Sequence, residues 1–141
     1  MDGQPSPPTS PLVRGHLAPP PRTLVDIFRA TVQRHPDVPA LDNGATSLTY
    51  AEFDEAASDV AEQLISVGVG PGAKVGVRVR SGTVDLYVAI MAILLAGGAY
   101  VPVDADDPDE RARTVFDEAA VTAIVGNDLV ITVPEPRATQ S

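Results

Sequence analysis

The sequence has 141 residues, which suits one compact domain, and 44% of them are hydrophobic, so a sizeable core can form. Its 10 basic and 19 acidic residues give a formal net charge of −9, which disfavours binding to nucleic acid or to anionic membranes. The lack of cysteine excludes disulfides, thiolate metal sites and cysteine nucleophiles.

Both ends of the chain differ in composition from its middle. Residues 1–22 are rich in proline, with Ser, Thr and Gly between the prolines, and this predicts a disordered leader. Residues 134–141 are expected to form a disordered tail, which leaves 23–133 as the folded domain. The first residues carry neither a basic region nor an apolar stretch, so we expect no secretory signal and a cytoplasmic protein.

The folded region is expected to open with a helix and a hairpin. Apolar residues recur at helical spacing from Thr23 to His35, and Pro36 ends the pattern. Two short extended segments follow at 40–42 and 47–49. Asn43-Gly44 lies between them and supplies the positive φ that a tight hairpin needs.

A second helix is predicted from a capping box. In Thr49-Tyr50-Ala51-Glu52, the side chains of Thr49 and Glu52 can each satisfy a free amide of the other residue. The helix is expected to end at Gly68. Val75, Val77 and Val79 then alternate with other residues at strand period. The apolar face of the helix consists of Phe53, Ala57, Val60 and Leu64.

Residues 86–103 carry no charge, which raises the question of a membrane span. Gly97 and Gly98 divide the run, and Asp85 and Asp104 close its ends, so a buried helix, turn and strand are favoured. Ser81 or Thr83 can cap that helix, and 99–103 is the predicted strand. A parallel sheet covered on both faces explains such an apolar run.

The last part of the folded region repeats the alternation of helix and strand. Asp107-Pro108-Asp109-Glu110 begins a helix to about Ala119, a strand is expected at 121–125, and 129–133 is a possible further strand. Strands and helices that alternate with short connections predict an α/β fold of parallel βαβ units. We expect the first two helices to pack against this layer.

No catalytic constellation emerges from the sequence. The glycine-rich segment 68–72 precedes a strand instead of a helix N-terminus, so a plain turn is favoured over a phosphate cradle. His16 and His35 have no partners at ligand spacing, and Lys74 is expected to be a surface charge. We therefore predict no catalytic, cofactor-binding or metal-binding residue in the chain.

The densest group of acids is interpreted as a solvated face at a helix start. Its pattern does not match a calcium loop, although carboxylate clusters can hold Mg²⁺ or Ca²⁺. Asp104 is of separate interest because it follows a strand at its carboxyl end, where α/β folds bind ligands. The group consists of Asp104, Asp106, Asp107, Asp109 and Glu110.

Two segments resemble signatures of a known family. Leu48-Thr49-Tyr50-Ala51-Glu52-Phe53 is similar to the L-[TS]-Y-x-E-L signature of adenylate-forming enzymes. The segment from Ile93 to Asp104, ILLAGGAYVPVD, is similar to the L-K-A-G-x-A-Y-V-P-[LI]-D signature of amino-acid adenylation domains in nonribosomal peptide synthetases. The resemblance runs from about Thr23 to Val133. It departs at Leu95, Ala105 and Asp107, where the family usually has Lys, Pro and Tyr.

The resemblance implies a partial N-terminal subdomain of an adenylate-forming enzyme. That family uses ATP and Mg²⁺ to convert an amino acid to an aminoacyl-adenylate and then passes the acyl group to a carrier-protein thiol. Its phosphate loop, adenine and ribose contacts and catalytic Lys are not found in these 141 residues, so we expect the isolated chain to be inactive. Gly97, Gly98 and the capping box then have scaffold roles, and Tyr100 and Val101 are expected to pack in the sheet.

Three hypotheses remain open from the sequence. The first is a fragment of an adenylation domain whose activity belongs to a longer parent. The second is a non-catalytic assembly module that pairs with a separately encoded remainder, because a sheet cut short leaves an unpaired edge and an uncovered apolar face. The third is a fragment of an acyl-CoA synthetase-like ligase.

Overall fold

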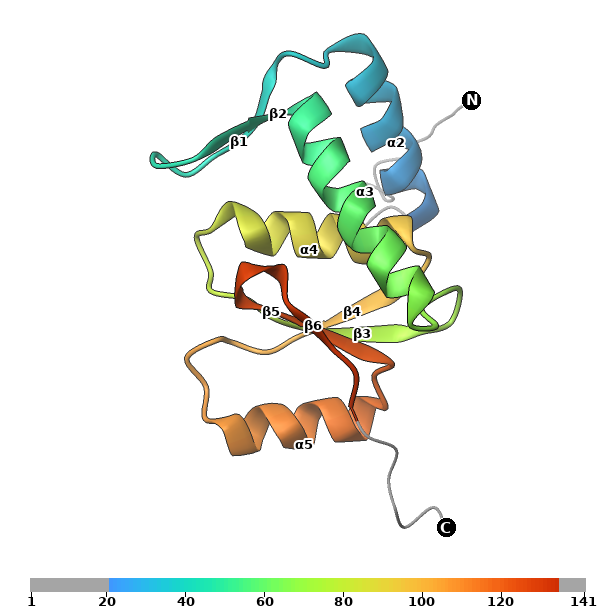
Figure 1. Cartoon of the computed structure of the whole chain (residues 1–141), viewed down its shortest axis with the longest axis vertical. Coiled ribbons are helices and arrows are strands. Elements are labelled where there is room, and N and C mark those ends of the chain that lie inside the picture. Colours follow the sequence, from blue (N-terminus) through green and yellow to red (C-terminus); the bar gives the residue numbers. More distant parts are fainter. Residues whose placement is uncertain (1–20, 135–141) are drawn as a thin grey trace, which may run out of the picture.

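A computed structural model describes residues 21–134 of the chain, and Figure 1 shows a sheet with helices on both of its faces. The predicted leader, apart from its last two residues, and the predicted tail, apart from Pro134, lie outside the described residues. The α/β fold with flanking helices is confirmed. None of the described helices is long and apolar enough to cross a membrane.

The first part of the fold is a helix, a hairpin and a second helix. These are α2 (Pro21–Arg34), β1 (Pro39–Asp42), β2 (Ser47–Thr49) and α3 (Tyr50–Ser66). The hairpin is antiparallel, and Gly44 in its loop has φ = 91°, as predicted. The loop is held by Asn43, whose Oδ1 accepts the amides of Ala45 and Thr46 at 3.0 and 2.8 Å.

The second part alternates strands and helices. Its elements are β3 (Lys74–Arg78), α4 (Val84–Leu95), β4 (Ala99–Pro102), α5 (Asp109–Ala119), β5 (Ala123–Gly126), the 3₁₀ turn η2 (Asn127–Leu129) and β6 (Ile131–Thr132). The uncharged run therefore forms a helix, a glycine turn and a strand, as predicted. Thr83 is the residue that caps α4, since its hydroxyl accepts the Leu86 amide.

The four strands lie in the order β4-β3-β5-β6. β3 is parallel to both β4 and β5, so the connections through α4 and α5 are crossovers between parallel strands. β6 is antiparallel to β5 because the chain reverses through the short turn η2. The two crossover helices cover opposite faces, α4 on one and α5 on the other (Figure 1).

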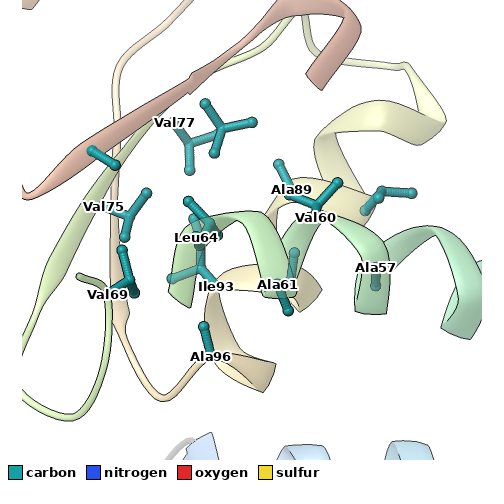
Figure 2. Close-up of a cluster of buried hydrophobic side chains, with 14 of the residues drawn as sticks. Ala57, Val60, Ala61, Leu64, Val69, Val75, Val77, Ala89, Ile93 and Ala96 are labelled. Carbon is teal, nitrogen blue, oxygen red and sulfur yellow. The ribbon is translucent and has the colours of Figure 1, made fainter. Parts of the chain in front are cut away.

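The larger core lies between α3, α4 and one face of the sheet (Figure 2). Side chains from β3, such as Val75 and Val77, meet Leu64 of α3 and Ile93 of α4, and all four are at most 1% exposed. Small residues let α3 and α4 approach closely. Ala57, Ala89 and Ala92 are fully buried.

The smaller core lies on the other face, under α5. It consists of Val103, Ala112, Phe116 and Val121. Gly76 of β3 is buried directly against the ring of Phe116, so this strand is covered on both faces. This agrees with the expectation of a parallel sheet that is covered on both faces.

Several details differ from the sequence-based predictions. α2 begins at Pro21, two residues early, because proline at the first helical position loses no hydrogen bond. The first two helices do pack against the α/β layer as expected, because α2 and α3 both contact α4. Tyr100 is 43% exposed because β4 lies at the end of the strand order, so the prediction that it packs in the sheet was wrong. Val101 does pack, against the smaller core.

Candidate functional site

The carboxyl edge of the sheet is where an α/β fold usually binds its ligand. Here it brings together Arg78 at the end of β3, Arg80 shortly after it, Asp104 after β4 and Asn127 after β5. From β3 the chain continues to β4 on one side of it, and from β4 it returns past β3 to β5 on the other side. The gap between β3 and β5 is therefore the topological switch point of the sheet. The side chains at this edge decide which chemistry is possible.

Arg78 is a structural clamp at this edge. One guanidinium nitrogen contacts Asp109 Oδ1 at 2.8 Å, and the other donates to the carbonyl oxygen of Asp107. Its Nε is buried without a hydrogen-bond partner. The side chain thereby fastens the start of α5 to the end of β3, and it is 23% exposed.

Asp104 shapes the turn that leads into α5. Its Oδ1 accepts the amide of Asp106 at 2.9 Å, and its carbonyl oxygen accepts the amide of Asp107 at 3.1 Å. Asp107 also pairs with Arg111 at 3.2 Å. Among residues 21–134 no group of three or more acids or histidines is placed to hold a metal ion.

A small hollow of about 240 Å³ lies at the same edge. Its walls carry Arg80, Asp85 and Asp128, so charges of both signs surround it. The Arg80 amide donates to Asn127 Oδ1 at 2.9 Å, which joins the ends of β3 and β5. Asp128 and Leu129 both have positive φ, near 62° and 61°. Among the described residues that line this hollow, Thr83 carries the only hydroxyl, and it donates to the carbonyl of Arg80 instead of to a base.

The glycine-rich segment forms a turn at the opposite edge of the sheet. The Ala73 amide donates to the carbonyl of Gly70 at 2.9 Å, and Gly72 has φ = 86°. The segment follows α3 and leads into β3, so it does not begin a helix of its own. The predicted plain turn is confirmed, and Lys74 beyond it is exposed.

The first motif segment forms the cap of α3. Thr49 Oγ1 accepts the Glu52 amide at 3.1 Å, and Glu52 Oε1 accepts the Thr49 amide at 2.9 Å. This is the predicted capping box. Tyr50, the first residue of α3, is partly buried against the larger core.

The second motif segment forms the junction from α4 to β4. Gly97 has φ = 90°, and the amides of Gly97 and Gly98 donate to the carbonyls of Leu94 and Ile93, both at 3.0 Å. This bond pattern is a Schellman motif, which ends the helix. Gly98 packs against the glycine-rich turn, because a Cβ there would lie 3.2 Å from Ala73 O.

Both motif segments therefore occupy backbone junctions, and neither presents a reactive side chain. His35 is exposed beyond the end of α2, far along the chain from the sheet, and His16 lies outside the described residues. The sequence-based interpretation placed the two motifs correctly. It missed Arg78, whose only signal was a charged residue directly after the apolar residues of the strand.

The two signatures and the α/β layer that carries them match one class of protein, the adenylate-forming enzymes. A sequence model of the AMP-binding enzyme family matches residues 28–140, and the chain belongs to this family. It is 32% identical over 114 residues to surfactin synthase subunit 2 of Bacillus subtilis, covering 81% of this chain and 3% of that protein. It is 34% identical over 130 residues to the phosphinothricin tripeptide synthetase PhsC of Streptomyces viridochromogenes, covering 85% of this chain and 12% of that protein.

Solved structures of peptide synthetases share the fold. The chain is 32% identical to the nonribosomal peptide synthetase FmoA3 in its AMPPNP-bound form, with a TM-score of 0.72 over 79% of this chain and 12% of that one. It is 29% identical to the N-terminal subdomain of Klebsiella oxytoca NpsA, with a TM-score of 0.65 over 80% of this chain and 29% of that one. The chain thus spans a small part of each relative.

Proposed function

We propose that this chain supplies the N-terminal scaffold of an adenylation domain that activates an amino acid with ATP. The observation that carries the proposal is the junction from Ile93 to Pro102, where the peptide-synthetase signature folds as a helix end, a glycine pair and a parallel strand. The relatives described above include peptide synthetases, which favours an amino acid over the acyl substrate of an acyl-CoA synthetase-like ligase.

The scaffold role concerns the chain itself, and the chemistry belongs to the complete domain. ATP and Mg²⁺ are the cofactors of that domain, and we propose that the 141 residues bind neither tightly by themselves. The acids nearest the carboxyl edge support this, because Asp107 and Asp109 already pair with arginines and Asp104 accepts a turn amide.

A chimaera tests the proposal. Residues 23–133 would replace the aligned segment of the Klebsiella oxytoca NpsA N-terminal subdomain within its complete protein, and ATP–pyrophosphate exchange would be measured. We expect exchange by the chimaera and none by the isolated chain. A matched chimaera with Gly97→Val should lose exchange together with stability, because position 97 requires positive φ.

Two results would contradict the proposal. Exchange by the isolated chain would show that it carries chemistry beyond a scaffold. A chimaera that folds, as judged by circular dichroism, but exchanges no pyrophosphate would show that this scaffold cannot stand in for that of an adenylation domain.

A second candidate function is that of an assembly module that pairs with a separately encoded remainder. Among the described strands, β4 pairs on one side only, and the nearby helix α4 leaves Tyr87 52% exposed. Unpaired strand edges and exposed aromatic side chains favour association. Co-purification with a polypeptide that contains the phosphate loop would support this function, whereas a monodisperse monomer with cooperative unfolding would argue against it.

A carrier protein is the proposed partner of the complete domain. Support comes from an artificially fused adenylation and PCP di-domain of Klebsiella oxytoca NpsA and ThdA, to which the chain is 29% identical with a TM-score of 0.67. A cytoplasmic location stays a prediction.

A further inference from the structure

A hollow of about 690 Å³ lies at the amino ends of β3 and β4, away from the carboxyl edge. Its walls come from three separate segments: the first turns of α2, the turn before β3 and the junction before β4. Most of the wall is apolar, with Val25, Pro71, Ala73 and Leu94 among its residues. Water makes few hydrogen bonds to apolar walls, so we expect an apolar hollow of this size to be filled by other apolar groups.

The floor of the hollow cannot easily collapse to fill it. A Cβ on Gly97 would lie 3.4 Å from Pro71 N, and a Cβ on Gly98 would lie 3.2 Å from Ala73 O. The Ala99 amide also donates to Ala73 O at 2.9 Å. The two turns are therefore in direct main-chain contact, and the hollow above them keeps its shape.

One wall belongs to the part of α2 that lies outside the family match. The match begins at residue 28, whereas Val25 and Asp26 line the hollow. The helix begins at Pro21, so the preceding twenty residues join the fold one turn away from Val25. This proximity makes the chain's own leader the nearest candidate occupant.

We propose that residues 11–17 of the leader occupy this hollow. This segment holds Leu12, Val13 and Leu17, the leader's largest apolar side chains after Met1. The wall carries Asp26 together with Arg29 and Lys74, so the fit of this segment rests on its apolar side chains and on the length of the tether, and charge does not contribute to it.

The length of the tether is sufficient. Pro21 is four positions after Leu17, and an extended chain covers about 3.3 Å per residue, so Leu17 reaches about 13 Å from the helix start. Along the axis of α2, Val25 lies about 6 Å and Arg29 about 12 Å from Pro21 at about 1.5 Å per residue. Leu17 can therefore lie beside the wall residues of α2 if the chain turns back at Pro19–Pro20.

A dye-binding experiment on the full chain tests whether the hollow is filled. The substitutions Leu12→Ser, Val13→Ser and Leu17→Ser are combined, and a fluorescent apolar dye is titrated. If the leader occupies the hollow at least about nine-tenths of the time, the variant binds the dye at least about tenfold more tightly than the parent. Gln4→Ala, Ser6→Ala and Thr9→Ala together are the matched control and should leave dye affinity unchanged. A parent chain that binds the dye as tightly as the triple serine variant would overturn the proposal and indicate a small-molecule site.

Disulfide trapping identifies the occupant, and the lack of native cysteine makes it specific. Leu17→Cys is combined with Ala73→Cys in the wall or, as control, with Glu118→Cys, which is exposed on α5 across the sheet. Oxidised glutathione takes up the two electrons and two protons released when each disulfide closes. We expect the wall pair to close within one molecule at least about tenfold faster than the control pair. Equal rates, or closure mainly between two molecules, would overturn the proposal.

Discussion

Replacement of Gly76 by alanine should destabilise the fold through a single steric clash. A Cβ at this position would lie 2.6, 2.8 and 2.9 Å from three ring carbons of Phe116. Carbon atoms in contact prefer about 3.5–4.0 Å, so the ring must move by roughly an ångström in a packed core. Overpacking of this kind costs about 1–3 kcal/mol.

The intrinsic preference of the strand acts in the opposite direction. Alanine is favoured over glycine in a strand by about 0.5–1 kcal/mol, so the midpoints of the two ranges leave a net loss of about 1 kcal/mol. Urea unfolding followed by far-ultraviolet circular dichroism measures this loss, and it suits a chain without tryptophan. Gly70→Ala is the matched control, because a Cβ at Gly70 meets nothing within 4 Å. Its stability should be unchanged or slightly raised.

A double-mutant cycle separates the clash from other causes. In a Phe116→Leu background the ring is absent, so Gly76→Ala should cost at least about 1 kcal/mol less than in the parent. The reasoning is refuted if Gly76→Ala is as stable as the parent, or if its cost is the same in both backgrounds.

Three further substitutions test the helix ends by the same urea assay. Thr49→Ala should lower the free energy of unfolding by about 1 kcal/mol, because the capping box is lost, whereas Thr49→Ser should lower it much less. Equal losses for the two variants would contradict a role for the hydrogen bond from the Glu52 amide. Gly97→Ala should cost about 1–2 kcal/mol because φ there is 90°, and an unchanged stability would show that the junction adapts. Ala120→Gly should instead raise stability by up to about 1 kcal/mol, because Ala120 has φ = 56°, a conformation that glycine adopts without strain. A loss of stability would show that the greater flexibility of glycine in the unfolded chain outweighs the relieved strain.

The elements with explicit terminal signals could be predicted from the sequence. The capping box at Thr49 located the start of α3, and the glycines at 68 and 97 located the ends of two helices, because positive φ at these positions favours glycine. Each of these signals acts within a few residues of the backbone it controls. Local hydrogen bonds and sterics are therefore enough to predict them.

The start of β5 illustrates what local signals miss. Valine at 121 suggested a strand from that position, but β5 begins at Ala123. Ala120 adopts the left-handed conformation, and the Val121 amide donates to Phe116 O at 3.3 Å, so Val121 still belongs to the end of α5. Alanine gives no sequence signal for a left-handed residue. The packing of Phe116 against Gly76, which the sequence does not show, holds this helix end in place.

The candidate site was predicted less completely than the fold. The two motif segments and the turn at 68–72 could be located, but the contact of that turn with the glycine pair could not, because it joins residues far apart in the sequence. Arg78 was missed for the same reason, since its partners follow it by 29 and 31 residues. Sequence patterns report periodicity along one element, whereas these contacts depend on which strands become neighbours.

The contact between the two turns explains why a peptide-synthetase signature can be specific without holding a reactive group. Gly98 fits only because no Cβ separates it from Ala73 O and Val69, and the Ala99 amide completes the contact at 2.9 Å. This one contact therefore fixes the relative positions of four element ends: the end of α3, the start of β3, the end of α4 and the start of β4. A side chain at Gly98 would shift two strands relative to each other and so displace every group that follows them at the carboxyl edge. The signature is then maintained by geometry, and its loss should lower stability and activity together in any complete domain built on this scaffold.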